Sequence, residues 1–188
     1  MQIKETYTVD IEKDVDTETI VSEHWKQNEK LHRKDKPAKL SYDPKTGKTD
    51  GVGWYLNGKA HRDNGPAVII RHPKGHICEK CWMKGGAEER RNGPSTIQFD
   101  SAGRVMFAQW KRHGVIHRLD GPSVIYRNGK TGVITDEEWH DNGQLHREDG
   151  PAIIRRDENT GEVIETLFFL YGKKRDGLEN SNIPSLGA

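Results

Sequence analysis

The stretch 139–154 reads W-H-D-N-G-Q-L-H-R-E-D-G-P-A-I-I, and the same phrase recurs along the chain. Earlier copies begin at the other four tryptophans, which are Trp25, Trp54, Trp82 and Trp110. Successive tryptophans are 29, 28, 28 and 29 residues apart, and Phe168 starts a shortened sixth copy. A fixed period of about 20–50 residues indicates a repeat architecture.

Three further positions recur at fixed distances from each tryptophan. Seven residues after it come His32, His61, Glu89, His117 and His146. Eight residues after it come Arg33, Arg62, Arg90, Arg118 and Arg147. Twelve residues after it come Pro37, Pro66, Pro94, Pro122 and Pro151.

The composition bounds the class of protein. Hydrophobic residues make up 32% of the 188 residues, which is lean for a thick globular core and suits a thin sheet that buries mainly one face. Charged residues make up 31%, but the formal net charge is only +1. This balance argues against a nucleic-acid or membrane partner held by bulk electrostatics.

Targeting signals are absent from the sequence pattern. No apolar run approaches the roughly 18 residues of a membrane span, and the stretch M-Q-I-K-E-T-Y-T-V-D has no signal-peptide core. Two cysteines three residues apart are not a secreted disulfide framework. We therefore expect a soluble cytoplasmic protein with no membrane partner.

The first half of each copy predicts a β-hairpin. An aromatic strand runs into a two-residue turn such as Asn57-Gly58. Asn-Gly is the strongest short hairpin signal, because a type I′ turn needs positive φ at both central residues. Such a turn fixes the pairing, so Trp54 is predicted to lie opposite His61. Arg62, one place later, is predicted to point to the other face of the sheet if the strand stays regular.

The second half of each copy predicts another strand. Proline has no N–H group and cannot continue a central ladder, so the strand must break or bulge there. A small residue follows, and two places later comes a branched apolar residue on the same face: Leu40, Ile69, Ile97, Ile125 or Ile154. Each copy closes with a loop that ends in glycine and absorbs the length variation, so these loops are predicted to be surface connections.

The ends of the chain differ from the repeats. Residues 1–24 hold a strand signal of period two, made by Ile3, Tyr7, Val9 and Ile11. This strand is predicted to cap the first repeat. Residues 25–167 comprise five repeats, and residues 168–188 comprise a truncated capping hairpin and a flexible tail. The predicted fold is all-β, an elongated antiparallel meander sheet of about a dozen strands built of about five 28–29-residue hairpin repeats with terminal caps.

The phrase W-x-x-N-G-x-x-H-R-x-D-G-P-A resembles the MORN-type repeat family, and within it the H-R-x-D-G-P-A variant of phage and large-virus proteins. The resemblance covers residues 25 to about 177. It implies an antiparallel meander with one hairpin per unit, and a non-enzymatic binding or scaffolding role. The longer period and the inserted D-G-P depart from the plain pattern and argue against a lipid-binding or kinase-linked role.

The arginine row is the first binding candidate, because Arg33, Arg62, Arg90, Arg118 and Arg147 could track phosphates or a carboxylate-rich partner. The structural alternative is that each histidine packs on its tryptophan while each arginine pairs with a turn aspartate, Asp35, Asp120 or Asp149. A feature repeated in every unit usually builds the unit. We therefore assign a structural role to Trp25, Trp54, Trp82, Trp110 and Trp139, and to His32, His61, His117 and His146.

The third copy, which runs from Trp82 to Phe99, is a second candidate. It alone has Glu89 in place of histidine and Gly85-Gly86 in the turn. An irregular copy is often where selection acted on something other than stacking, and simple drift is the alternative. Both interpretations stay open, and Glu89 and Trp82 join the candidate binding residues.

A weak metal candidate is the set His72, His76, Cys78 and Cys81. Two histidines and two cysteines suffice for tetrahedral zinc. A single C-x2-C is a weak signal, however, and strand alternation sends the two cysteines to opposite faces unless a bulge intervenes. We predict no metal and no cofactor.

No catalytic motif stands out, so no enzyme is predicted. We expect a binding protein, a phage-type accessory inhibitor that holds a host defence protein through one sheet face in the host cytoplasm. One alternative is a protein that sequesters a nucleotide-type signal molecule through arginine and tryptophan. Another is a single-strand nucleic-acid binder, which the charge balance disfavours. A homo-oligomer is left open.

Overall fold

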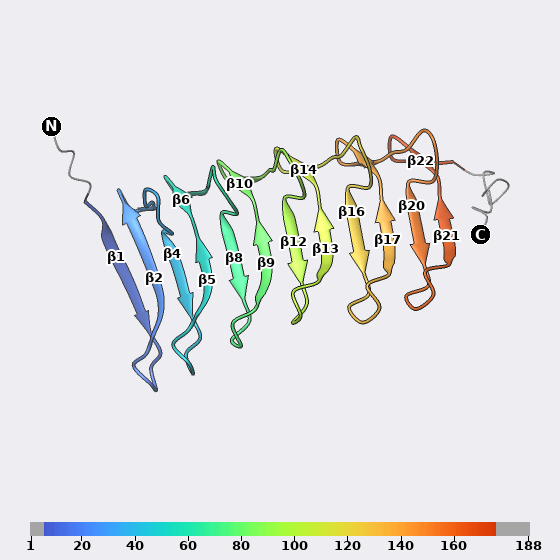
Figure 1. The fold of residues 1–188 in the computed structure, drawn as a ribbon. Coiled ribbons are helices and arrows are strands. Elements are labelled where there is room, and N and C mark those ends of the chain that lie inside the picture. The colour runs from blue at the N-terminus through green and yellow to red at the C-terminus, as the bar shows by residue number, and fades with distance from the viewer. Residues whose placement is uncertain (1–5, 176–188) are drawn as a thin grey trace.

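The computed structural model describes residues 6–175, and every regular element in that range is a β-strand. The long strands lie side by side in one elongated layer, with β1 at one end and β21 at the other (Figure 1). The sheet is antiparallel and is not closed into a barrel. The predicted all-β meander is therefore confirmed.

The main sheet has thirteen strands within the described residues. Twelve of them are hydrogen-bonded neighbours in chain order, and β3 (Lys30–Leu31) pairs with β2. The twelve are β1 Thr8–Lys13, β2 Ile20–Gln27, β4 Lys39–Tyr42, β5 Thr49–Gly53, β8 Val68–Arg71, β9 Ile77–Cys81, β12 Thr96–Phe99, β13 Val105–Gln109, β16 Val124–Arg127, β17 Ile134–Glu138, β20 Ile153–Arg156 and β21 Val163–Leu167.

Short hairpins follow Trp54, Trp82, Trp110, Trp139 and Phe168 and gather along one edge of the layer, which we call the hairpin edge (Figure 1). They are β6 Tyr55–Leu56 with β7 Lys59–Ala60, β10 Met83–Lys84 with β11 Ala87–Glu88, β14 Lys111–Arg112 with β15 Val115–Ile116, β18 His140–Asp141 with β19 Gln144–Leu145, and β22 Phe169–Leu170 with β23 Lys173–Lys174. Each unit thus has a short and a long hairpin, whereas the family resemblance implied one.

The turn chemistry explains the short hairpins. Asn57 and Gly58 both have positive φ, at 52° and 81°, as a type I′ turn requires. Tyr55 then pairs with Ala60. The predicted register is confirmed, because the His61 backbone N–H donates to the Trp54 carbonyl oxygen at 2.9 Å.

The ladder resumes immediately after each proline at a small residue. The Trp82 N–H donates to the Ser95 carbonyl at 2.7 Å, and the Ser95 N–H donates to the Gln109 carbonyl at 2.8 Å. The five residues at this position are completely buried, which explains their size: Ala38, Ala67, Ser95, Ser123 and Ala152.

One face of the sheet carries a line of mostly apolar side chains, which Lys80 and Glu137 interrupt. The register aligns Leu40 with Val52, Val52 with Ile69, and Ile97 with Ala108. We call this line the apolar row; it comprises Leu40, Val52, Ile69, Ile97, Ala108, Ile125 and Ile154. Apart from the buried Ala108, its members are only half-buried, since no second layer covers the sheet within residues 6–175.

The N-terminal segment is more regular than the sequence suggested. The predicted strand exists as β1, but it forms a complete long hairpin with β2, and Ile3 lies outside the described residues. The Asp14 carboxylate accepts from the Thr17 N–H at 2.9 Å, just as Asp43 accepts from Thr46 at 2.7 Å. Residues 8–24 are therefore half of a further repeat.

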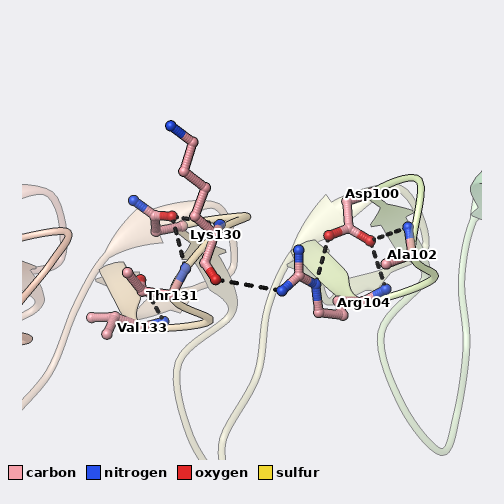
Figure 2. Close-up of polar contacts among 7 residues, drawn as sticks. Asp100, Ala102, Arg104, Lys130, Thr131 and Val133 are labelled. Atoms are coloured by element: carbon pink, nitrogen blue, oxygen red, sulfur yellow. Dashed lines mark hydrogen bonds and ion pairs between the residues drawn. The ribbon is translucent and has the colours of Figure 1, made fainter.

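The opposite edge, which we call the loop edge, is made of the loops that close the long hairpins. Figure 2 shows Asp100 accepting hydrogen bonds from the backbone N–H groups of Ala102 and Arg104, both at 2.9 Å. Arg104 also donates to the Lys130 carbonyl of the next loop at 3.4 Å. At the C-terminal end, β22 and β23 supply the predicted closing hairpin, and the predicted tail lies outside the described residues.

Candidate functional site

Each repeat arginine lies over the tryptophan ring of its own repeat. The distances from guanidinium carbon to ring centroid are 3.5 Å for Arg33, 3.7 Å for Arg62, 3.8 Å for Arg90, 4.1 Å for Arg118 and 4.1 Å for Arg147. The arginine is predicted to point to the other face only if the strand stays regular, and this condition is not met. The short hairpin ends just before the arginine, so strand alternation no longer applies there.

The D-G-P turn completes this stack. The Arg90 Nη1 donates to the Pro94 carbonyl at 3.3 Å, and the other four arginines make the same bond. A Cβ at Gly93 would lie only 3.1 Å from the guanidinium carbon of Arg90. Glycine leaves room for the guanidinium in four repeats, whereas the first repeat has Lys36 here and keeps Arg33 over Trp25 all the same.

The expected pairing of arginine with a turn aspartate occurs in two repeats. Arg118 contacts Asp120 at 2.8 Å, and Arg147 contacts Asp149 at 2.9 Å. Hydrogen bonding to the guanidinium lowers the pKa of each of these exposed carboxyls. Arg33 makes no such pair with Asp35 among the described contacts, so aspartate is not what fixes the arginine.

The histidines join one repeat to the next. Their packing on tryptophan stays a prediction, and each Nδ1 accepts a backbone N–H from the following short hairpin. The four bonds are Asn57 N to His32 at 3.1 Å, Gly85 N to His61 at 3.1 Å, Asn142 N to His117 at 3.2 Å and Tyr171 N to His146 at 3.3 Å. The sequence predicted the position of these histidines opposite their tryptophans. It could not show the hydrogen-bond donor in the next repeat.

The third repeat replaces this link with a side-chain contact. The Glu89 carboxylate lies 3.0 Å from Nδ1 of His113, which stands in the turn of the next short hairpin. The same repeat has Arg91 and Asn92 between its arginine and its glycine, so it is the only repeat without a carboxylate in that turn.

Grooves lie between successive short hairpins. Each groove is named by the two repeats that line it, counted from the repeat that begins at Trp25. The 1–2 groove, about 420 Å³, is lined by Arg33, Lys34, Asp35, Trp54, Leu56, His61, Arg62, Asp63 and Asn64. The 3–4 groove, about 410 Å³, is lined by Glu89, Arg90, Arg91, Trp110, Lys111, Arg112, His113, His117, Arg118, Leu119 and Asp120. The 4–5 groove, about 620 Å³, is lined by Arg118, Leu119, Asp120, Gly121, Trp139, His140, Asp141, His146, Arg147, Glu148 and Asp149.

The charges of these grooves differ although their shapes recur. The 3–4 groove has five arginine and lysine side chains against two carboxylates. The 4–5 groove has two arginines against four carboxylates, and the 1–2 groove has three cations against two carboxylates. Sequence reasoning singled out Glu89 but missed Arg91, Lys111 and Arg112. A charge comparison of the aligned copies would have found them.

Arg90 is one of three stacked arginines, with Arg33 and Arg62, that have no ion pair among the described contacts. Burial lowers the pKa of Arg90, and no carboxylate lies within ion-pair distance of it in the described part of the chain. Its polar partner is the Pro94 carbonyl. Arg91 and Arg112 are exposed and likewise have no described ion pair.

The weak metal candidate does not form a site in the described structure. His72 and His76 stack on each other with ring centroids 4.7 Å apart. Cys81 is buried and accepts a contact from the Thr96 hydroxyl at 3.6 Å, while Cys78 falls where the register shifts. Within residues 6–175, no three potential ligands converge on one point.

A serine, a histidine and a glutamate meet near the 4–5 groove, and sequence reasoning did not find them. The Ser123 hydroxyl lies 2.9 Å from Nδ1 of His140, and Nε2 of His140 lies 3.7 Å from Glu138. Burial raises the pKa of Glu138 and lowers that of His140. Ser123 is completely buried and donates to the Glu138 carbonyl, so no substrate can reach its hydroxyl. The cluster is structural.

The comparisons with known proteins add no assignment: no family model, no curated protein and no solved structure matches the chain. Among residues 6–175 there is no helix long and apolar enough to cross a membrane.

Proposed function

We propose that this chain is a non-enzymatic binding protein that holds a partner protein against the apolar row of its sheet. One observation carries the proposal. Across the nine strands from β4 to β20 on a single layer, seven positions of one line are apolar and two are charged, Lys80 and Glu137. Six of the seven apolar side chains remain partly exposed. A line of this kind is typical of a surface that becomes buried in a complex.

The opposite face makes a poorer surface for the same purpose. Its register aligns Gln98 with Glu79, and Tyr126 with Asp136. The centres of protein interfaces are depleted in charged residues. The face with the apolar row is favoured because its line has seven apolar positions, although Lys80 and Glu137 interrupt it. The resemblance to MORN-type repeats of phage proteins supports a host defence protein as the partner.

The nucleic-acid alternative is less well supported. Base stacking needs open aromatic faces, and in all five repeats a guanidinium occupies one face of the tryptophan. The near-neutral charge of the chain also opposes it.

Affinity purification with paired variants tests the proposal. The Ile97→Thr and Ile125→Thr double variant keeps β-branched residues in the strands but makes the apolar row polar. Its matched control is Ile70→Thr with Tyr126→Thr, since both side chains are 44% exposed on the opposite face.

The expected result is one stoichiometric bacterial protein, identified by mass spectrometry and rebound in purified form by the wild type and the control. The row variant should lose it while keeping the wild-type circular dichroism spectrum. Equal binding by both double variants would contradict the proposal.

A further inference from the structure

We propose that the 3–4 groove binds a diphosphate group carried by a small organic molecule. This inference is independent of the protein-binding proposal, because no member of the apolar row lines the groove. It rests on a difference in lining charge between this groove and the other described grooves. The backbone repeats from groove to groove, so the side chains make this difference.

The first step of the argument is charge. Five arginine and lysine side chains line the groove against Glu89 and Asp120. Lys111 already pairs with Glu88 at 3.0 Å, and Arg118 pairs with Asp120 at 2.8 Å. Three guanidinium groups therefore remain without a carboxylate partner in the described structure, namely Arg90, Arg91 and Arg112.

The second step is the chemistry of the free cations. Guanidinium presents its donors in a planar fork that matches phosphate oxygens two at a time. Three such groups suit a ligand with several negative charges and many acceptor oxygens, which a diphosphate provides and a single carboxylate does not. The chain elsewhere is nearly neutral, so this groove concentrates the positive charge.

The third step is the arrangement of the groove. Arg90 is fixed by Trp82 on one side and by the Pro94 carbonyl, so its orientation is set before a ligand arrives. Arg91 and Arg112 come from successive repeats and are exposed at the two sides. The volume of about 410 Å³ lies in the ordinary range for small-molecule sites and leaves room for an organic group beyond the phosphates.

The fourth step is the contrast with the adjoining groove. In the 4–5 groove, Leu119 stands at the position of Arg91 and Asp141 at the position of Arg112. Four carboxylates line that groove, so it repels the anion that the 3–4 groove attracts. The lining charge therefore distinguishes the 3–4 groove from the adjoining 4–5 groove.

Isothermal titration calorimetry of the full chain at low ionic strength tests the inference, with inorganic pyrophosphate and adenosine diphosphate as separate probes. Arg91→Ala with Arg112→Ala removes the two exposed guanidinium groups and leaves the Arg90 stack intact. Lys34→Ala with Lys84→Ala is the matched control, because these exposed lysines occupy the equivalent positions in other repeats and the change in net charge is the same.

The wild type and the lysine control should bind at one site with dissociation constants within twofold of each other. The arginine double variant should bind at least tenfold more weakly, with an unchanged melting temperature. Tighter binding of adenosine diphosphate than of pyrophosphate would identify the organic part as a contributor. No binding of either probe at millimolar concentration, or equal weakening in both double variants, would overturn the inference.

Discussion

The two edges of this sheet are built on different principles. At the hairpin edge, each of the five repeats has the same tryptophan, arginine and proline carbonyl in the same contact. At the loop edge, an aspartate or asparagine mainly organises its own loop, and described contacts between loops depend on particular residues such as Arg104 and Thr131. The hairpin edge therefore uses one contact unchanged within every repeat, whereas the contacts at the loop edge vary from loop to loop.

The largest expected effect comes from breaking the hairpin edge at a tryptophan. Trp110→Ala should destabilise the protein by about 3 kcal/mol, because it removes a large ring and leaves Arg118 without its stacking partner. Urea denaturation followed by circular dichroism measures the change. The control at the loop edge is Thr131→Ala, which should cost less than about 1 kcal/mol. Similar costs for the two variants would contradict the distinction between the edges.

A smaller effect is expected at the link between repeats. His117→Ala removes the acceptor for the Asn142 N–H, and the His117 side chain is only 11% exposed. The loss should be about 1–2 kcal/mol. Amide hydrogen exchange should show the Asn142 N–H losing protection while the loop-edge amides keep theirs. Unchanged protection would show that the histidine does not fasten the repeats.

The repeat fold could be predicted because its signals are local. The spacing of the tryptophans gives the period, and Asn57-Gly58 gives the turn and its register. The partners of Arg90 and His61 could not be predicted in the same way. The arginine lies beyond the end of the hairpin, and the histidine accepts a hydrogen bond from a backbone N–H of the next unit.

The candidate site was predictable only in part. Glu89 was identifiable as the odd residue at a repeated position, but the groove it borders depends on Arg91 and Arg112, which come from different units. The N-terminal hairpin was missed because Glu18 stands where the other loops have glycine, which hid the D-x-x-T pattern that begins at Asp14.

Acid should weaken the loop edge before the hairpin contacts between tryptophan and arginine. Hydrogen bonds from the Thr160 and Asn159 N–H groups lower the pKa of Asp157 below its ordinary value of 3.8. Its stabilising contribution is complete above the unfolded value and is lost as the pH falls through the lower folded value.

Asp157→Asn should therefore flatten the fall in melting temperature between about pH 5 and pH 2. Asn128 performs the same role in the preceding loop with a neutral amide, so Asn128→Asp should steepen it. Identical pH profiles for these two variants and the wild type would contradict the assignment.

The smallest expected effect is a gain in stability. Glu18 has a φ of 56° where the equivalent Gly47 has 65°, and a left-handed conformation is costly for a residue with a Cβ. Glu18→Gly should raise the unfolding free energy by about 0.5–1 kcal/mol. Thermal unfolding measures this change, and Gly47→Glu should lower the melting temperature by a similar amount. A loss of stability in Glu18→Gly would show that the left-handed conformation of Glu18 does not destabilise the protein.

Each described strand of the main sheet is hydrogen-bonded only to its immediate neighbours. Units can therefore be added or removed by design. Residues 110–138 begin and end at equivalent places, so duplicating this segment should lengthen the molecule by one module and leave the others undisturbed. Among residues 6–175, β1 and β21 each pair with a strand on one side alone, and so fraying of this part should start there and progress inward.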